Sequence, residues 1–130
     1  MTKVAYVDTS ALVKLVLDEA DSPQMRGWYI EAARVLVSQI GIIETQRAAA
    51  RRQHDPVHLR VILESIESID LDPAIERTAA TVGPASLKTL DAIHLATALA
   101  LMPELDAFVT YDDRLAEAAR GLGLPVVRPA

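Results

Sequence analysis

Short apolar runs of strand character alternate along this chain with longer segments whose apolar positions recur at helical spacing. The run "KVAYVD", residues 3–8, is rich in β-forming residues and stops at an Asp-Thr-Ser cluster, as strands commonly do. "SALVKLVLDEA", residues 10–20, then has the spacing of an amphipathic helix. Farther along, Ser22 followed by Pro23 is typical of a helix start, and Ser38 is a candidate cap for the next helix.

Extended to the whole chain, this pattern predicts alternating strands and helices. The predicted strands cover residues 3–8, 35–38, 106–111 and 125–128, and the predicted helices cover 10–20, 22–34, 39–53, 57–67, 73–82, 88–102 and 113–121. Such alternation indicates an α/β fold with a mainly parallel central sheet, in which helices dominate. The sequence has no internal repeat and no linker, so we expect residues 1–130 to form a single domain.

Composition excludes several classes of protein. Hydrophobic residues make up 51% and charged residues 24%, as in ordinary soluble domains, and the absence of cysteine excludes disulfides and thiolate metal sites. Asp8 and Lys14 interrupt the N-terminal apolar run, which fits a signal peptide poorly, and no run of about 18 apolar residues could span a membrane. We therefore expect a cytoplasmic protein without membrane contact.

The charge of the chain is acidic overall but basic in one segment. A net charge of −5 argues against a plain duplex-DNA-binding module. Between Arg47 and Arg60, however, the chain has four arginines, two histidines and a single acid. This segment is compatible with contact to a nucleic acid, and a solvated helix face explains it equally well.

The segment "TLDAIHLATALAL", residues 89–101, is apolar apart from Asp91, His94 and its threonines. Burying an isolated carboxylate in apolar surroundings costs at least several kcal/mol. Either the helix N-terminus stabilises Asp91, with Thr89 as the cap, or a cation does. We interpret His94, one turn later, as a helix-face or interface residue.

Further acids stand next to the predicted strands. Asp8 ends the first strand and Asp112 directly follows the third, so a parallel sheet brings both to the edge where ligands bind. Each of these acids, taken alone, could be present only to cap the helix that follows it. Glu44 follows the apolar run "IGII". A surface ion pair between Glu44 and Arg47 or Arg51 would be a structural explanation for this acid.

Together these acids point to a metal ion. Converging carboxylates repel one another and have raised pKa values unless a cation is present. Oxygen ligands without cysteine suit Mg²⁺ or Mn²⁺ better than zinc. At a sheet edge, such an ion suits phosphoryl transfer, because it neutralises phosphate oxygens and activates water.

Four motifs, in order and over nearly the whole chain, resemble the PIN-domain ribonuclease family, and most closely its VapC toxins. They are "YVDTSALVKL", "IIETQRA", "LKTLDAIHLATAL" and "FVTYDDRLAEAAR". The resemblance implies a three-layer α/β/α fold with helix-rich flanks. It also implies a metal-dependent endoribonuclease that hydrolyses single-stranded or structured RNA, such as tRNA or rRNA, and that forms a homodimer and binds a VapB-like antitoxin.

The resemblance also assigns roles to individual residues. The acids implied to hold Mg²⁺ or Mn²⁺ and to be catalytic are Asp8, Glu44, Asp91 and Asp112, with Asp113 as an assisting acid. The hydroxyl residues implied to support them are Thr9, Ser10 and Thr110. On the helix face of Glu44, Arg47 and Arg51 are our candidates for contact with RNA or the antitoxin. Tyr6 and Tyr111 lie in predicted strands, and we expect them in the core rather than stacked on bases.

Other classes of protein with acids at strand ends fit less well. A phosphoacceptor receiver has an acidic pair after its first strand and a lysine after its last, whereas "VDTSA" has one acid and "PVVRP" has no lysine. A haloacid-dehalogenase-type phosphatase needs Asp-x-Asp, and Ser10 stands at the second position. Two alternatives within the resembled family stay open: a PIN nuclease of RNA processing outside a toxin pair, and a catalytically silent PIN-fold interaction module.

Overall fold

The computed structural model describes residues 2–130 and contains a five-stranded parallel sheet. The strands are β1 (Val4–Val7), β2 (Arg34–Ser38), β3 (Glu67–Ile69), β4 (Ala107–Val109) and β5 (Val126–Val127). Their order across the sheet is β3-β2-β1-β4-β5, and every neighbouring pair is parallel. The prediction of a mainly parallel α/β sheet is therefore confirmed.

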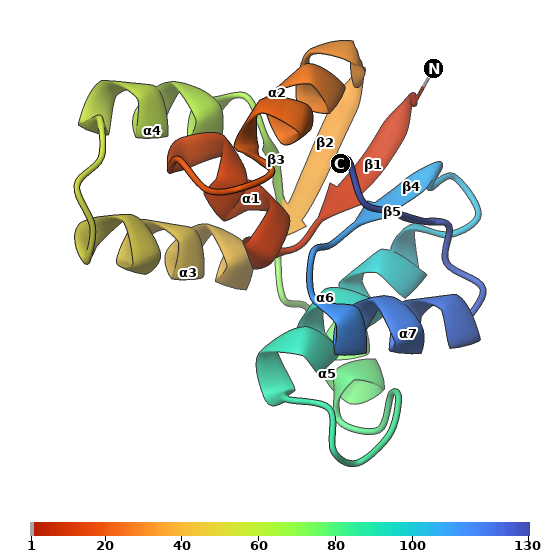
Figure 1. Cartoon of the computed structure of the whole chain (residues 1–130). Helices are drawn as coiled ribbons and strands as arrows, with labels where there is room; N and C mark the ends of the chain where they lie inside the picture. The colour runs from red at the N-terminus through yellow and green to blue at the C-terminus, as the bar shows by residue number, and fades with distance from the viewer. Residues whose placement is uncertain (1) are drawn as a thin grey trace.

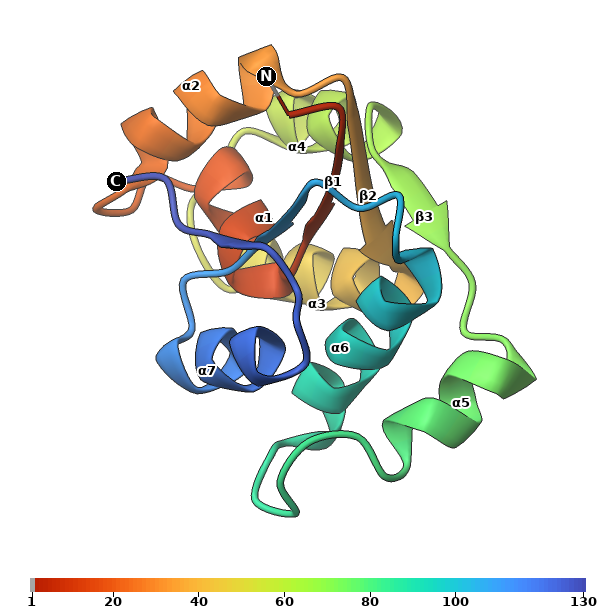
Figure 2. The ribbon, with the colours of Figure 1, turned by 90° about the vertical axis from the view of Figure 1, so that its right-hand side faces the viewer.

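Helices cover both faces of the sheet and make the fold a three-layer α/β/α sandwich. They are α1 (Thr9–Val16), α2 (Ser22–Glu31), α3 (Gln39–Ala50), α4 (Pro56–Glu64), α5 (Pro73–Ala79), α6 (Thr89–Leu101) and α7 (Asp113–Gly121). Figure 1 shows α1 to α4 on one side of the sheet and α5 to α7 on the other, and Figure 2 shows the same layers after a quarter turn. Within the described range, no helix is long and apolar enough to cross a bilayer.

The alternation of side chains along β1 divides the core into two halves. Ala5 and Val7 pack with Leu12 of α1 in one cluster, whereas Tyr6 points the opposite way and packs with Leu95 of α6. All five of these side chains are fully buried. Burying a large apolar side chain contributes about 1.5–3 kcal/mol, so both faces of this strand anchor a helical layer.

The predicted helix over 57–67 is wrong at its C-terminal end, where the structure has a strand. Helix α4 ends at Glu64, and β3 follows at the sheet edge, with Ser68 opposite Val37. This strand has three residues, and two of them are exposed, so it lacks the alternating pattern that marks a longer strand. Pairing with β2, which the local sequence does not encode, decides its conformation.

Several other predicted elements extend beyond their observed ends. Helices predicted over 10–20 and 22–34 stop at Val16 and Glu31. The second of these stops early because Arg34 pairs with Val4 in the sheet and so belongs to β2. The expected cap at Ser38 is confirmed, since its hydroxyl accepts a hydrogen bond of 3.2 Å from the backbone N–H of Ile40.

Candidate functional site

The carboxyl ends of β1, β2 and β4 meet at one edge of the sheet because these neighbouring strands are parallel. The arrowheads of β1 and β2 in Figure 1 end beside the first turns of α1 and α3. Asp8 lies between β1 and α1, and Asp112 precedes α7 just after β4. Helices α3 and α6 supply Glu44 and Asp91.

Asp8 is the most deeply buried of the four acids, with 2% of its surface exposed. Its Oδ1 accepts hydrogen bonds from the Ser10 hydroxyl (2.7 Å) and the Ala11 backbone N–H (2.9 Å), and its Oδ2 accepts one from the Thr110 hydroxyl (2.6 Å). The predicted capping role is therefore real. Burial nevertheless raises the pKa of Asp8 against the opposing effects of His94 and these hydrogen bonds, so capping alone does not compensate its charge.

The hydroxyls of Thr110 and Ser10 join the ends of β4 and β1. Thr110 donates to Asp8 and accepts a 3.0 Å hydrogen bond from the backbone N–H of Asp112. Ser10 likewise donates to Asp8 and accepts from the backbone N–H of Tyr111 at 2.9 Å. Two short polar side chains thus hold the first and fourth acids at a fixed relative position.

Glu44 lies on the inner side of α3 and is tied to two neighbouring side chains. Its Oε1 accepts a 2.6 Å hydrogen bond from the Thr9 hydroxyl and lies 3.4 Å from Nε2 of His94. Burial raises the pKa of the Glu44 carboxyl, but the contacts with His94 and Thr9 outweigh it and hold that pKa below its usual value. In the part of the chain that the structure describes, neither Arg47 nor Arg51 pairs with Glu44, so the surface-pair explanation is wrong.

Asp91 lies in the first turn of α6, as predicted, but Thr89 is not the cap. The N-cap position belongs to Lys88, and no side chain caps the helix there. The helix N-terminus still favours a negative charge at this position. It does not fully compensate Asp91, because the pKa of this carboxyl is raised.

The causes of this raised pKa place the four acids near one another. Burial of Asp91 is the largest cause, and the negative charge of Asp112 is the next. The charges of Asp8 and Glu44 act in the same direction, while His94 opposes them. All three of the other acids therefore lie close enough to disfavour ionisation of Asp91.

The group has the chemistry of a site for a hard cation. Residues 2–130 contain no three His, Asp or Glu side chains already arranged as metal ligands. Asp91 and Asp112 are only partly buried, so their carboxylates are open to an ion from solvent. Carboxylate oxygens that repel one another at a single strand edge suit Mg²⁺ or Mn²⁺, because the ion's charge removes that repulsion.

The structure does not bring Asp113 into this group. Its side chain is 88% exposed and forms an ion pair of 2.5 Å with Arg128. Asp112, by contrast, turns back to the helix, where its Oδ1 accepts a 2.9 Å hydrogen bond from the backbone N–H of Leu115. Of the two adjacent acids, Asp112 is the one whose charge raises the pKa of Asp91.

The basic segment Arg47–Arg60 is only partly neutralised. Arg52 pairs with Glu19 at 2.8 Å, and Arg60 lies 4.0 Å from Glu64. Arg47 and Arg51 are exposed and form no ion pair with any residue that the structure describes. These two arginines, one in α3 with Glu44 and the other at the C-cap of that helix, present uncompensated positive charge.

The interpretation of His94 as a helix-face or interface residue is wrong. Its side chain is 2% exposed and faces the sheet edge, where Nδ1 lies 2.6 Å from the Tyr6 hydroxyl and Nε2 lies 3.1 Å from the Thr9 hydroxyl. The sequence holds one signal for this contact: the Tyr6 hydroxyl, in a strand expected to be buried, needs a partner. Tyr6 itself is buried as predicted, and Tyr111 packs at the edge of the core.

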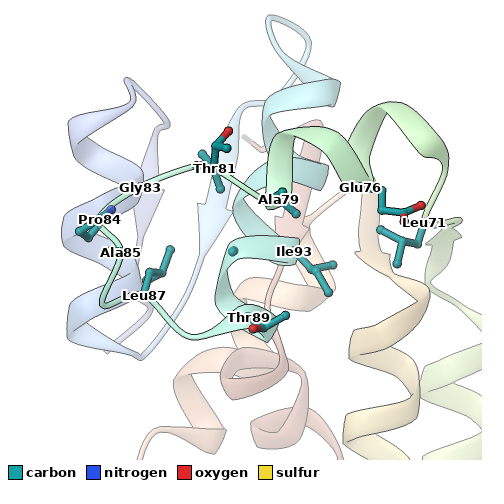
Figure 3. A pocket seen from close by; sticks show the side chains of 13 residues that line it. Leu71, Glu76, Ala79, Thr81, Gly83, Pro84, Ala85, Leu87, Thr89 and Ile93 are labelled. Carbon is teal, nitrogen blue, oxygen red and sulfur yellow. The ribbon is translucent and has the colours of Figure 1, made fainter.

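A pocket of about 610 Å³ lies beside the acids rather than around them. It is formed by α5, the loop before α6 and the first turns of α6, with Leu87, Thr89 and Ile93 among its lining residues (Figure 3). None of the four acids lines this pocket, although Thr89 is only two positions from Asp91. The pocket therefore does not mark the site.

Comparison with known proteins agrees with this arrangement. The family model described as "PIN domain" matches residues 5–121. Ribonuclease VapC47 of Mycobacterium tuberculosis is 36% identical over an alignment of 130 positions, which covers 95% of this chain and 96% of that protein. Most of the chain, including all four acids, lies within both matches.

Solved structures share the fold at low sequence identity. VapC20 of Mycobacterium tuberculosis, a toxin that cleaves the sarcin–ricin loop, aligns with a TM-score of 0.72 at 18% identity over 96% of this chain and 99% of that one. A toxin–antitoxin complex from Klebsiella pneumoniae contains a chain that aligns with a TM-score of 0.69 at 22% identity, over 97% and 98% of the two chains. The family match, the VapC47 relative and the shared fold lead to one conclusion: this chain belongs to the PIN-domain family.

Proposed function

We propose that this protein is a divalent-metal-dependent endoribonuclease and the toxin of a VapBC-type toxin–antitoxin module. The observation that carries the proposal is the group of four acids at one sheet edge, in which burial and the charges of the other three acids raise the pKa of Asp91. The similarity to VapC47, a ribonuclease by name, supports RNA as the substrate. A silent interaction module would not need to maintain such a costly group of like charges.

In this proposal Asp8, Glu44, Asp91 and Asp112 hold Mg²⁺ or Mn²⁺. When bound, a divalent cation supplies activation of water and neutralisation of the negative charge on a phosphodiester. The protein's own contribution is to fix the ligand oxygens. Three donors hold Asp8, and one hydroxyl and one imidazole hold Glu44.

Arg47 and Arg51 are proposed to bind RNA phosphates or an acidic part of the antitoxin. We expect Arg47→Ala with Arg51→Ala to weaken RNA binding severalfold and to reduce the salt dependence of binding, by about 0.7 in log–log slope for each phosphate that is no longer neutralised. Filter binding to single-stranded RNA over a range of salt concentrations measures both. Arg60→Ala is the matched control, because Arg60 already lies near an acid, Glu64. An unchanged salt slope in the double variant would contradict the assignment.

The proposed partners follow from the relatives. The Klebsiella pneumoniae structure is a toxin–antitoxin complex, which supports a VapB-like antitoxin as the protein partner of this chain. We also propose that residues 1–130 form one PIN domain, that two copies form a homodimer, and that the protein acts in the cytoplasm. Size-exclusion chromatography of the protein alone and with its co-expressed antitoxin tests the assembly.

Metal removal tests the proposed activity. Incubated with a total RNA pool and Mg²⁺, the purified protein should produce discrete fragments, and EDTA should abolish them because it removes the cation that activates water. Restoring Mg²⁺ or Mn²⁺ should restore cleavage. Equal fragmentation with Mg²⁺ and with EDTA, or no cleavage of any RNA, would reject the proposal.

A further inference from the structure

A line of buried polar groups runs through the core to Glu44. The Tyr6 hydroxyl lies 3.1 Å from the backbone N of Ser38 and 2.6 Å from Nδ1 of His94. On the other side of the imidazole, Nε2 lies 3.1 Å from the Thr9 hydroxyl, which donates to Oε1 of Glu44 at 2.6 Å. The line joins β1, β2, α1, α3 and α6 at the sheet edge where their ends meet.

The end of this line at Tyr6 has a defined donor. The backbone N–H of Ser38 can only donate, so the Tyr6 oxygen accepts from it, and the Tyr6 hydroxyl shares a 2.6 Å hydrogen bond with Nδ1 of His94. Burial raises the pKa of the Tyr6 hydroxyl, which therefore keeps its proton.

At the other end, the carboxylate of Glu44 can only accept. The Thr9 hydroxyl therefore accepts from Nε2 of His94 and donates to Oε1 of Glu44. Every polar side-chain atom in the line therefore has a hydrogen-bond partner. In the described part of the chain, no buried side-chain nitrogen or oxygen lacks a partner. Such fully satisfied networks are rigid.

Gly41, in the first turn of α3, leaves space for Val37 and for the imidazole of this line. A Cβ at this position would lie 2.6 Å from Cγ2 of Val37 and 3.1 Å from Cε1 of His94. Glycine is a weak helix former, so its presence one turn before Glu44 needs a local reason. The close approach of the Val37 side chain and of the imidazole to the helix backbone is that reason.

We propose that Tyr6, His94 and Thr9 are positioning residues that fix Oε1 of Glu44 and leave its Oε2 for the divalent cation. This inference rests on the proposed function. Among the residues that the structure describes, no donor reaches Oε2, whereas Oε1 has both the Thr9 hydroxyl and the imidazole beside it. Partners that orient a metal ligand typically change metal affinity or activity by about 10–100-fold when they are removed.

The test is Mn²⁺ binding by isothermal titration in the absence of RNA. We expect Tyr6→Phe and Thr9→Val to weaken Mn²⁺ binding roughly tenfold or more, and Thr9→Ser to restore it, because serine keeps the hydroxyl. Tyr6→Phe should fold, since the ring keeps its stack on Phe108 at 5.5 Å. Tyr111→Phe is the matched control, because the Tyr111 hydroxyl donates to the backbone of Pro129, away from the acids.

Cleavage adds a second readout. Raising the Mn²⁺ concentration should restore the maximal rate of Tyr6→Phe, because the variant loses ligand position and not a ligand. Wild-type affinity for Mn²⁺ in both Tyr6→Phe and Thr9→Val would overturn the inference. Binding of Mn²⁺ by the wild type without RNA cleavage would instead reject the proposed function and leave the inference standing. No Mn²⁺ binding by the wild type would overturn both.

Discussion

Replacing Asp91 by asparagine should reduce RNA cleavage by about 10³-fold, the effect of losing several kcal/mol of metal-dependent stabilisation, without lowering the melting temperature of the metal-free protein. The two effects have one cause. Burial and the charge of Asp112 raise the pKa of Asp91, so its ionised form is disfavoured in the folded state. Asparagine removes that unfavourable charge together with the metal ligand. Partial exposure of Asp91 screens the interaction and keeps any gain in stability small.

The raised pKa of Asp91 also determines how this carboxyl contributes to the stability of the metal-free protein at different pH values. A carboxyl whose pKa is higher in the folded state binds its proton more tightly there than in the unfolded chain. Without metal, the contribution of Asp91 is therefore favourable below the unfolded pKa of about 3.9 and is lost as pH rises through the higher folded pKa. Over that window the melting temperature of the wild type should fall with rising pH relative to that of Asp91→Asn, because only the wild type loses this contribution.

Thermal melts in EDTA from pH 4 to pH 8, with cleavage assays in Mg²⁺, measure both effects. Asp70→Asn is the matched control: Asp70 is exposed and far from the acids in sequence, and the substitution removes the same charge. A metal-free Asp91→Asn protein that melts well below the wild type would mean that Asp91 stabilises the fold, as a helix-terminal acid does. Undiminished RNA cleavage by Asp91→Asn would show that Asp91 is not a metal ligand.

The fold followed from the sequence where an apolar pattern is clear. Strand β1 is an apolar run that ends at a recognisable polar cluster, and helix α6 is a long segment whose apolar residues face the core. Strand β3 did not follow, because it has three residues and forms only by pairing with β2 at the sheet edge. Its sequence continues the apolar spacing of the preceding helix, and nothing local distinguishes it from a fourth helical turn.

The acids of the site were accessible to sequence reasoning for a topological reason. Asp8 and Asp112 stand at the ends of strands, and a parallel sheet places such ends together. His94 was not accessible, because its partner Tyr6 lies 88 positions away and the imidazole sits in an otherwise apolar helix. Its role depends on the distance between α6 and β1, and on the room that Gly41 leaves, which only the folded structure provides.

Addition of Mn²⁺ should stabilise the wild-type protein, and Asp8→Asn should lose this stabilisation together with cleavage. At a Mn²⁺ concentration of about 100 times the dissociation constant, the free energy of unfolding of the wild type should rise by about 2.7 kcal/mol. Asparagine is nearly the same size as aspartate, so a loss of the response in Asp8→Asn would report on the lost carboxylate oxygen and not on packing.

The cap explains why asparagine fails at this position. Oδ1 of Asp8 accepts from both the Ser10 hydroxyl and the Ala11 backbone N–H, so the amide oxygen of asparagine must take its place. The amide NH₂ then occupies the position of Oδ2, where it cannot accept the hydrogen bond from the Thr110 hydroxyl and repels a cation. Melts with increasing Mn²⁺ concentrations compare the two proteins directly. An Asp8→Asn protein that Mn²⁺ stabilises as much as it does the wild type would show that Asp8 is only the cap of α1, and the metal would then have to bind elsewhere.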